Sequence, residues 1–162
     1  MIEVVRLKNL LENHLYGNLK LENYKIKTIP AIKLLTFNRF DIAFKLLYLE
    51  MLKFDIEFSK EIYKEHIRAF SLGKFTEPGN DDKNSFDKFT NDFDKTFEDI
   101  KLNGFDANKT LIPLSKNGSI ANGAHRVASA IYLGKDVDCV EIDTRDHIYD
   151  YKFFYSRNIS SS

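Results

Sequence analysis

Five apolar side chains recur every three or four residues between Phe86 and Ile100, and this spacing predicts an amphipathic helix with one buried face. The positions are Phe86, Phe89, Phe93, Phe97 and Ile100. Asp82 or Asn84 is suited to cap its start, and Asn103-Gly104 is suited to the left-handed cap that ends many helices. The stripe obliges the chain to place a second layer against this helix.

The segment that follows predicts two strands joined to a helix. T-L-I-P-L-S and S-I-A flank Lys116-Asn117-Gly118, where Asn-Gly is the preferred pair of a type I′ hairpin turn. The helix that begins at N-G-A-H-R turns Val127, Ala130 and Ile131 inward and ends at Gly134. V-D-C-V-E-I-D then returns as a strand, in which Cys139 is expected to be a buried core residue.

The first half of the chain reads mainly as helix. An apolar stripe in T-F-N-R-F-D-I-A-F-K-L-L-Y-L-E-M-L-K predicts one buried helical face, made by Phe37, Phe40, Phe44, Leu47 and Met51. Arg39, Asp41 and Lys45 lie opposite, so Asp41 and Lys45 are expected to form a solvated i,i+4 ion pair. H-I-R-A-F-S-L-G predicts a short strand, K-F-T-E-P-G-N-D-D-K-N-S a loop, and Y-D-Y-K-F-F-Y a last strand or short helix. This order predicts an α+β fold.

Composition excludes several classes of function. The 162 residues suit one domain, and 24 basic against 24 acidic residues leave no excess positive charge for generic nucleic-acid binding. One cysteine rules out an intrachain disulfide framework, and no apolar run is long enough for a membrane span. The expected location is the cytoplasm. No His, Asp and Glu spacing resembles a zinc site, and His14 and His147 look incidental.

The unit G-F-D-A-N-K-T-L-I-P-L-S-K-N-G-S-I-A-N-G-A-H-R-V-A-S-A-I-Y-L-G-K-D-V-D-C-V resembles the core of the ParB/sulfiredoxin superfamily. Its members share a helix, a strand pair, a [D/N]-G-x-H-R-x-x-A turn and helix, and a closing strand. The resemblance implies a small mixed sheet with packed helices, a nucleotide-binding core over residues 66–155 and a helical N-terminal addition over residues 1–65, all in one domain.

The resemblance also implies a nucleotide site with ATP, or alternatively CTP, and Mg²⁺ as cofactors. The phosphates would lie on the turn Asn122, Gly123, Ala124, His125 and Arg126, and Lys83 and Ser85 would add to it. Gly123 matches the glycine that lets backbone approach phosphate, and His125 and Arg126 match the phosphate-binding pair.

Candidate catalytic groups come from elsewhere, because Asn122 cannot act as a general base. Glu77, in the E-P-G loop, is the first candidate base, with Asp41 as the alternative, and His125 completes the catalytic set. Arg39, Lys45, His66 and Arg68 are candidates for binding the acceptor.

Three functions fit these residues. The first is an ATP-dependent small-molecule kinase, whose acceptor is a sugar or sugar-linked compound, since R-F-D-I and E-P-G beside N-G-A-H-R resemble proteins of bacterial surface-polysaccharide biosynthesis. The second is a regulatory module that binds CTP or ATP without catalysis. The third, a DNA-binding protein, is disfavoured because only a short segment follows the last strand. Sulfiredoxin chemistry is not expected, because Ala124 stands where its cysteine would be.

Overall fold

The computed structural model describes residues 1–77 and 81–159. Its central sheet has three strands in the order β3-β5-β4, with β3 spanning Ile26–Pro30, β4 Ile112–Leu114 and β5 Asp136–Glu141. β5 pairs with β3 in antiparallel fashion and with β4 in parallel. A parallel pair needs a crossover, and helix α5 (Ala124–Tyr132) supplies it.

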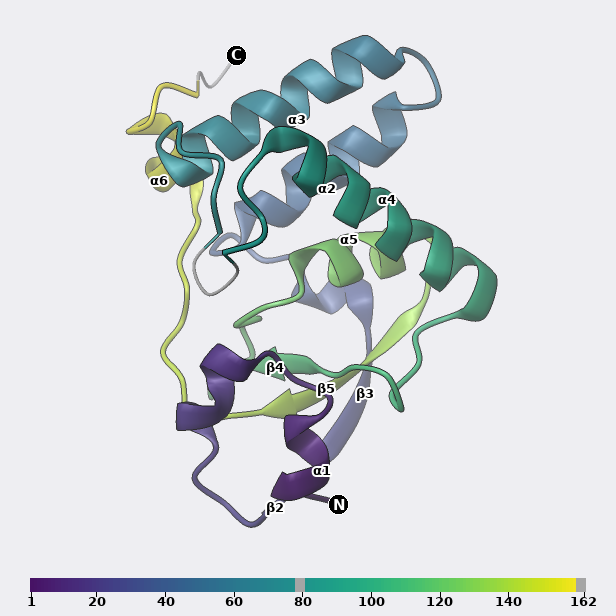
Figure 1. Ribbon diagram of the computed structural model, residues 1–162, viewed down its shortest axis with the longest axis vertical. Helices are drawn as coiled ribbons and strands as arrows, with labels where there is room; N and C mark the ends of the chain where they lie inside the picture. The colour runs from purple at the N-terminus through teal and green to yellow at the C-terminus, as the bar shows by residue number, and fades with distance from the viewer. Residues whose placement is uncertain (78–80, 160–162) are drawn as a thin grey trace.

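Further helices gather with α5 on one side of the sheet (Figure 1). α2 spans Phe40–Met51 and α4 spans Phe86–Asn103, and both pack against α5. α3 (Ile56–Ser71) packs on α2, and the short α6 (Tyr151–Tyr155) packs on α3. The expected α+β class is therefore confirmed.

The N-terminal segment lies on the other face of the sheet. It consists of β1 (Ile2–Glu3), α1 (Val4–Lys8), a 3₁₀ helix η1 (Asn13–Asn18) and β2 (Asn23–Tyr24). A second 3₁₀ helix, η2 (Ala31–Leu34), follows β3. Alternation along β5 explains the two layers, since Val137 and Cys139 face the helices while Val140 faces the N-terminal segment. Residues 1–65 are thus not only helical, because they contribute a strand of the central sheet.

The predicted helix of residues 86–103 is confirmed, with Phe89, Phe93 and Ile100 buried. Its cap differs from the prediction. The Ser85 hydroxyl accepts a hydrogen bond from the Lys88 backbone N–H, and neither Asp82 nor Asn84 caps the helix. Serine satisfies one of the otherwise unpaired N–H groups of the first turn. Gly104 ends the helix with φ 75° and ψ −176°, which is a positive φ but not the left-handed helical cap that was expected.

The buried face of α2 was predicted wrongly. Phe37 precedes the helix and is 95% exposed, and Leu47 is also exposed. The buried side chains are instead Asp41, Ile42, Lys45, Tyr48 and Leu49. Polar residues occupy this face because it borders a cleft, whereas Phe40 and Phe44 pack against Phe154 of α6.

The predicted strand at residues 66–73 is also wrong, since α3 continues to Ser71. Tyr63, His66 and Ile67 keep one helical face buried, and this 3.6-residue period outweighs the short alternation seen in the sequence. The loop after α3 is confirmed in its described part, whereas Pro78 and Gly79 lie outside the described residues.

The tight turn before α5 forms, with Gly118 N–H donating to Ser115 C=O at 2.9 Å and Leu114 bridging to Ile120. It is not type I′, because that turn needs positive φ at both central residues. Those residues are Lys116 and Asn117, and the positive φ falls on Gly118, at 78°. The last predicted element, given as strand or short helix, is the helix α6.

Candidate functional site

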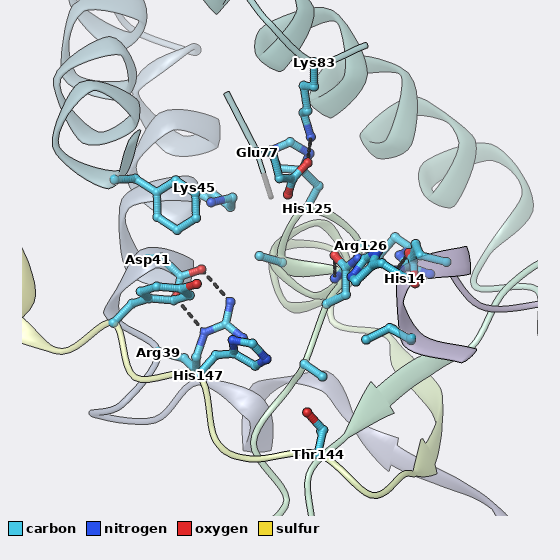
Figure 2. Close-up of a pocket in the computed structure, with 18 of the residues that line it drawn as sticks. His14, Arg39, Asp41, Lys45, Glu77, Lys83, His125, Arg126, Thr144 and His147 are labelled. Carbon is cyan, nitrogen blue, oxygen red and sulfur yellow. Dashed lines mark hydrogen bonds and ion pairs between the residues drawn. The ribbon is translucent and has the colours of Figure 1, made fainter. Parts of the chain in front are cut away.

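A cleft of about 1100 Å³ opens beside the start of α5. Its walls are η1, the first half of α2, the end of α3, the loop before α4, the first half of α4, the turn at residues 121–126 and the segment after β5. Figure 2 shows the charged side chains gathered around it. The basic ones are Arg39, Lys45, Lys83, Arg126 and Arg145, and the acidic ones are Glu12, Asp41, Glu77, Asp92 and Asp143.

The start of α5 has no side-chain cap. Gly123 takes the left-handed conformation there, with φ 92° and ψ 28°, and its N–H donates to the Asn122 side-chain oxygen at 2.6 Å. The first backbone bond of the helix runs from Val127 N–H to Gly123 C=O. Within the described residues, the N–H groups of residues 124–126 have no acceptor. The cleft therefore meets a helix start with three available donors and a positive dipole end.

Arg126 lies beneath this turn and is held by protein groups. Its guanidinium donates to Glu12 Oε1 at 2.6 Å, to the Thr110 hydroxyl, and to Leu111 C=O at 3.3 Å. A Cβ on residue 123 would come within 2.7 Å of Arg126 Nη2, so only glycine allows this close approach. In this arrangement Arg126 fastens α5 to η1 and to the chain before β4.

His125 is enclosed between Asp92 and Tyr63. Its Nδ1 lies 3.4 Å from Asp92 Oδ2, its Nε2 lies 2.7 Å from the Tyr63 hydroxyl, and its ring stacks on Phe93 at 4.5 Å. Burial lowers the pKa of His125 to about 3, although the Asp92 carboxylate acts in the opposite direction. A neutral ring with its proton on Nδ1 satisfies both partners, donating to Asp92 and accepting from Tyr63.

Lys83 joins two carboxylates at the cleft wall. Its ammonium lies 3.1 Å from Glu77 Oε2 and 2.9 Å from Asp92 Oδ2, over the ring of Phe89, and its side chain is 8% exposed. Hydrogen bonds from His125 and Lys83 hold the pKa of Asp92 well below its usual range. One cation between two acids gives this triad a net charge of about −1 at pH 7.

The expected Asp41–Lys45 surface pair is wrong. Asp41 is buried and accepts two hydrogen bonds from Arg39, at 2.9 Å to Nε and 2.7 Å to Nη2. Arg39 also donates to Ile120 C=O at 2.5 Å. Burial alone would raise the pKa of Asp41, and the charge and hydrogen bonds of Arg39 lower it instead. Arginine wins this carboxylate because its planar guanidinium matches both oxygens, which an ammonium cannot do.

Lys45 is left without a carboxylate partner in the part of the chain that the structure describes. Its ammonium lies 3.3 Å from His66 Nε2. Burial lowers the pKa of Lys45 to about 8, with the charge of Asp41 acting against that shift.

Three predicted residues lie away from the cleft. Ser85 caps α4, and Arg68 pairs with Glu65 at 2.8 Å and does not line the cleft. His66 is buried against Phe44, where burial lowers its pKa well below the usual value, and it reaches the cleft only through Lys45. The other predicted residues, Arg39, Asp41, Lys45, Glu77, Lys83 and Asn122 to Arg126, all line the cleft.

Sequence reasoning missed several residues of the site. Glu12, Asp92 and Tyr149 line the cleft, and His14 and His147, expected to be incidental, line it too. Asp92 stands next to the predicted stripe residue Phe93, which would have placed it near the buried face of α4. No local pattern marks Glu12, because long-range folding brings it to Arg126.

Over residues 1–77 and 81–159, no group of three or more His, Cys, Asp or Glu side chains is arranged to hold a metal ion. None of the helices described is both long and apolar enough to cross a bilayer. Comparisons with protein-family models, curated proteins and solved structures found no match to this chain.

Proposed function

We propose that this protein is a nucleotide-dependent small-molecule kinase that binds the phosphates of ATP at the start of α5 and a hydroxyl acceptor in the same cleft. The observation that carries the proposal is the uncapped α5 start, which opens onto a cleft that also contains Lys83. Backbone N–H groups at a helix start are a frequent phosphate site. A ParB/sulfiredoxin-like architecture, cofactors ATP and Mg²⁺, and a cytoplasmic location belong to the same proposal.

The chain's own groups then have distinct roles. The N–H groups of residues 124–126 donate to phosphate oxygens, and Lys83 offsets charge that develops during transfer. Glu77 takes the proton of the acceptor hydroxyl. At the same time the acceptor oxygen bonds to the γ-phosphoryl group of ATP, and ADP leaves. Mg²⁺ usually binds through one or two carboxylates and the substrate phosphates, and the net negative Glu77–Lys83–Asp92 triad suits that demand.

Asp41 is less suited to act as the base. Both of its oxygens accept hydrogen bonds from Arg39, and its lowered pKa makes it a weaker proton acceptor. We assign it to positioning, since it fixes Arg39 and through it Ile120 beside the turn. His125, neutral and bonded on both ring nitrogens, likewise positions Asp92.

The binding step is tested by Ala124→Asp, with Ala124→Asn as the matched control. Aspartate in the first turn favours the helix itself but repels phosphate, so the fold is kept while the site is blocked. Tm is measured with ATP, ADP, CTP and GTP plus Mg²⁺. We expect ATP to raise the Tm of the wild type and of Ala124→Asn but not of Ala124→Asp. An equal rise in all three, or no rise with any nucleotide in the wild type, contradicts the proposal.

The transfer step is tested by ³¹P NMR of ATP with pools of sugars and other hydroxyl compounds. We expect Glu77→Gln to lose transfer while it keeps the ATP-induced rise in Tm. Glu65→Gln, whose partner Arg68 lies outside the cleft, is the control and keeps both. Unchanged turnover in Glu77→Gln removes this residue from the mechanism.

One observation favours a second function, a nucleotide-binding module without catalysis. Each acid on this part of the cleft wall is already paired with a cation. Lys83 pairs with both Glu77 and Asp92, whereas Arg39 pairs with Asp41. ATP binding that depends on Ala124, combined with no transfer to any acceptor pool, would favour this alternative.

A further inference from the structure

The ammonium of Lys45 is an incompletely satisfied charge at the cleft wall. The residue is 6% exposed and lines the cleft, and it carries three N–H donors. One of them meets His66 Nε2 at 3.3 Å, and the aromatic face of Tyr63 lies 6.0 Å away. No other acceptor for this ammonium is found among the described residues.

The neighbouring charges do not neutralise it. On its own helix, Asp41 is committed to Arg39 by two hydrogen bonds. From α3, His66 is neutral and accepts through Nε2, which leaves its buried Nδ1 without a partner. On the loop before α4, Glu77 is paired with Lys83. The Arg39–Asp41–Lys45 group therefore carries a net charge of about +1 when Lys45 is protonated.

A buried ammonium without a counterion is unfavourable, and an oxyanion from a ligand would supply the missing partner. Figure 2 shows Lys45 and the Arg39–Asp41 pair on the α2 side of the cleft, across from Arg126. Lys45 thus lies on the opposite side of the cleft from Arg126, for which the carboxylate of Glu12 already supplies an anion.

We propose that Lys45 is the anchor of a second anion site, which binds a carboxylate or phosphate group of a ligand other than the nucleotide. If the protein is the kinase proposed above, this ligand is the acceptor. Only this identification of the ligand rests on the proposed function. The acceptor is then itself an anion, either a hydroxy acid or a phosphorylated hydroxyl compound, and uncharged sugars are poor substrates.

The test uses inorganic phosphate and malonate as probes, without nucleotide. The Lys45 side-chain resonances of the isotope-labelled wild type are followed against pH with and without each anion. We expect at least one anion to raise the pKa of Lys45 by about one unit, which corresponds to about tenfold tighter binding to the protonated form. The anion with the lower Kd identifies the ligand group as phosphate or carboxylate.

Lys45→Met removes the charge at nearly constant length, and Lys64→Met, at an exposed position of α3, is the matched control. We expect the anion's affinity to fall at least tenfold in Lys45→Met and to stay within twofold in Lys64→Met. A Lys45 pKa that stays unshifted with both anions, each at 100 mM, overturns the inference. This measurement on the wild type decides even where Lys45→Met fails to fold. The inference is also overturned if Lys45→Met binds the anion with the same affinity as the wild type.

The two proposals fail separately. If the Lys45 pKa responds to phosphate or malonate but no nucleotide raises the Tm, the kinase proposal is wrong and the anion site stands. If ATP binds in an Ala124-dependent way but Lys45 does not respond, the anion site is wrong and the nucleotide site stands.

Discussion

Replacing Asp41 by asparagine should destabilise the protein strongly. The change leaves the buried Arg39 guanidinium without its counterion and weakens two hydrogen bonds of 2.9 and 2.7 Å. Removing one partner of a buried ion pair costs about 3–5 kcal/mol, and hydrogen bonds to charged groups contribute about 1.5–3 kcal/mol each. We expect the free energy of unfolding to fall by at least about 3 kcal/mol. In a chain of this size that lowers Tm by about 6 °C or more.

Urea unfolding at pH 7, with an unchanged m-value, measures this effect. Glu98→Gln, which removes one partner of the exposed Glu98–Lys101 pair, is the control and should leave stability unchanged within error. The double variant Arg39→Met with Asp41→Leu removes both charges and should cost much less than the sum of the two single changes.

The same pair makes stability depend on pH. Because the folded pKa of Asp41 lies below its usual value of 3.8, the carboxylate stabilises the fold above that pH. This contribution is lost as pH falls through the folded pKa, and the difference between wild type and Asp41→Asn should shrink in that range. A cost below about 1 kcal/mol at pH 7 is what a solvated pair would give, and it would refute the assignment of a buried pair.

Three further outcomes are expected. Gly123→Ala should lower stability by about 2–4 kcal/mol, because φ is positive and the new Cβ crowds Arg126. Gly118→Ala, with a positive φ but open space, should cost only about 1–2 kcal/mol. Thermal melts that show equal losses for the two variants would contradict this. The pKa of His125 is about 3 in the folded protein, against the usual 6.5 of a histidine in the unfolded chain. Between these pH values the unfolded chain binds one more proton than the folded protein. The free energy of unfolding should therefore fall by up to about 1.4 kcal/mol per pH unit as the pH drops below 6.5. Urea unfolding from pH 7 to 4 checks it, and the slope should be smaller in His125→Phe. Ser85→Ala should cost about 1 kcal/mol through the lost cap, with the ATP-induced rise in Tm unchanged; a lost rise would return Ser85 to the nucleotide site.

The parts of the fold that follow from local patterns could be predicted from the sequence. The helix of residues 86–103 has one strong apolar stripe and a glycine at its end, although its cap is Ser85 and not a predicted residue. The turn, helix and strand around Gly123 also have glycines at the required places. α2 and α3 were misjudged in part because both have apolar residues on more than one face. Which face is buried then depends on the neighbouring helices, and sequence periodicity does not contain that information.

The site was predictable only as a set of residue types. Asp41, Lys45, Glu77 and Lys83 were candidates, and all four line one cleft. Their pairing was not predictable, because Arg39 rather than Lys45 takes Asp41, and Lys83 takes both Glu77 and Asp92. Such choices are made by distance and burial after folding, when several cations compete for each carboxylate.

The position of β5 between β3 and β4 has a consequence for any attempt to transplant the H-R motif. A fragment that starts after residue 65 would leave one edge of β5 unpaired, and it would deprive Arg126 of Glu12. The motif therefore depends on parts of the chain that lie far from it in sequence. Grafted alone into another scaffold, it would reproduce the glycine turn, but it would lack both the Glu12 contact of Arg126 and Lys45 across the cleft.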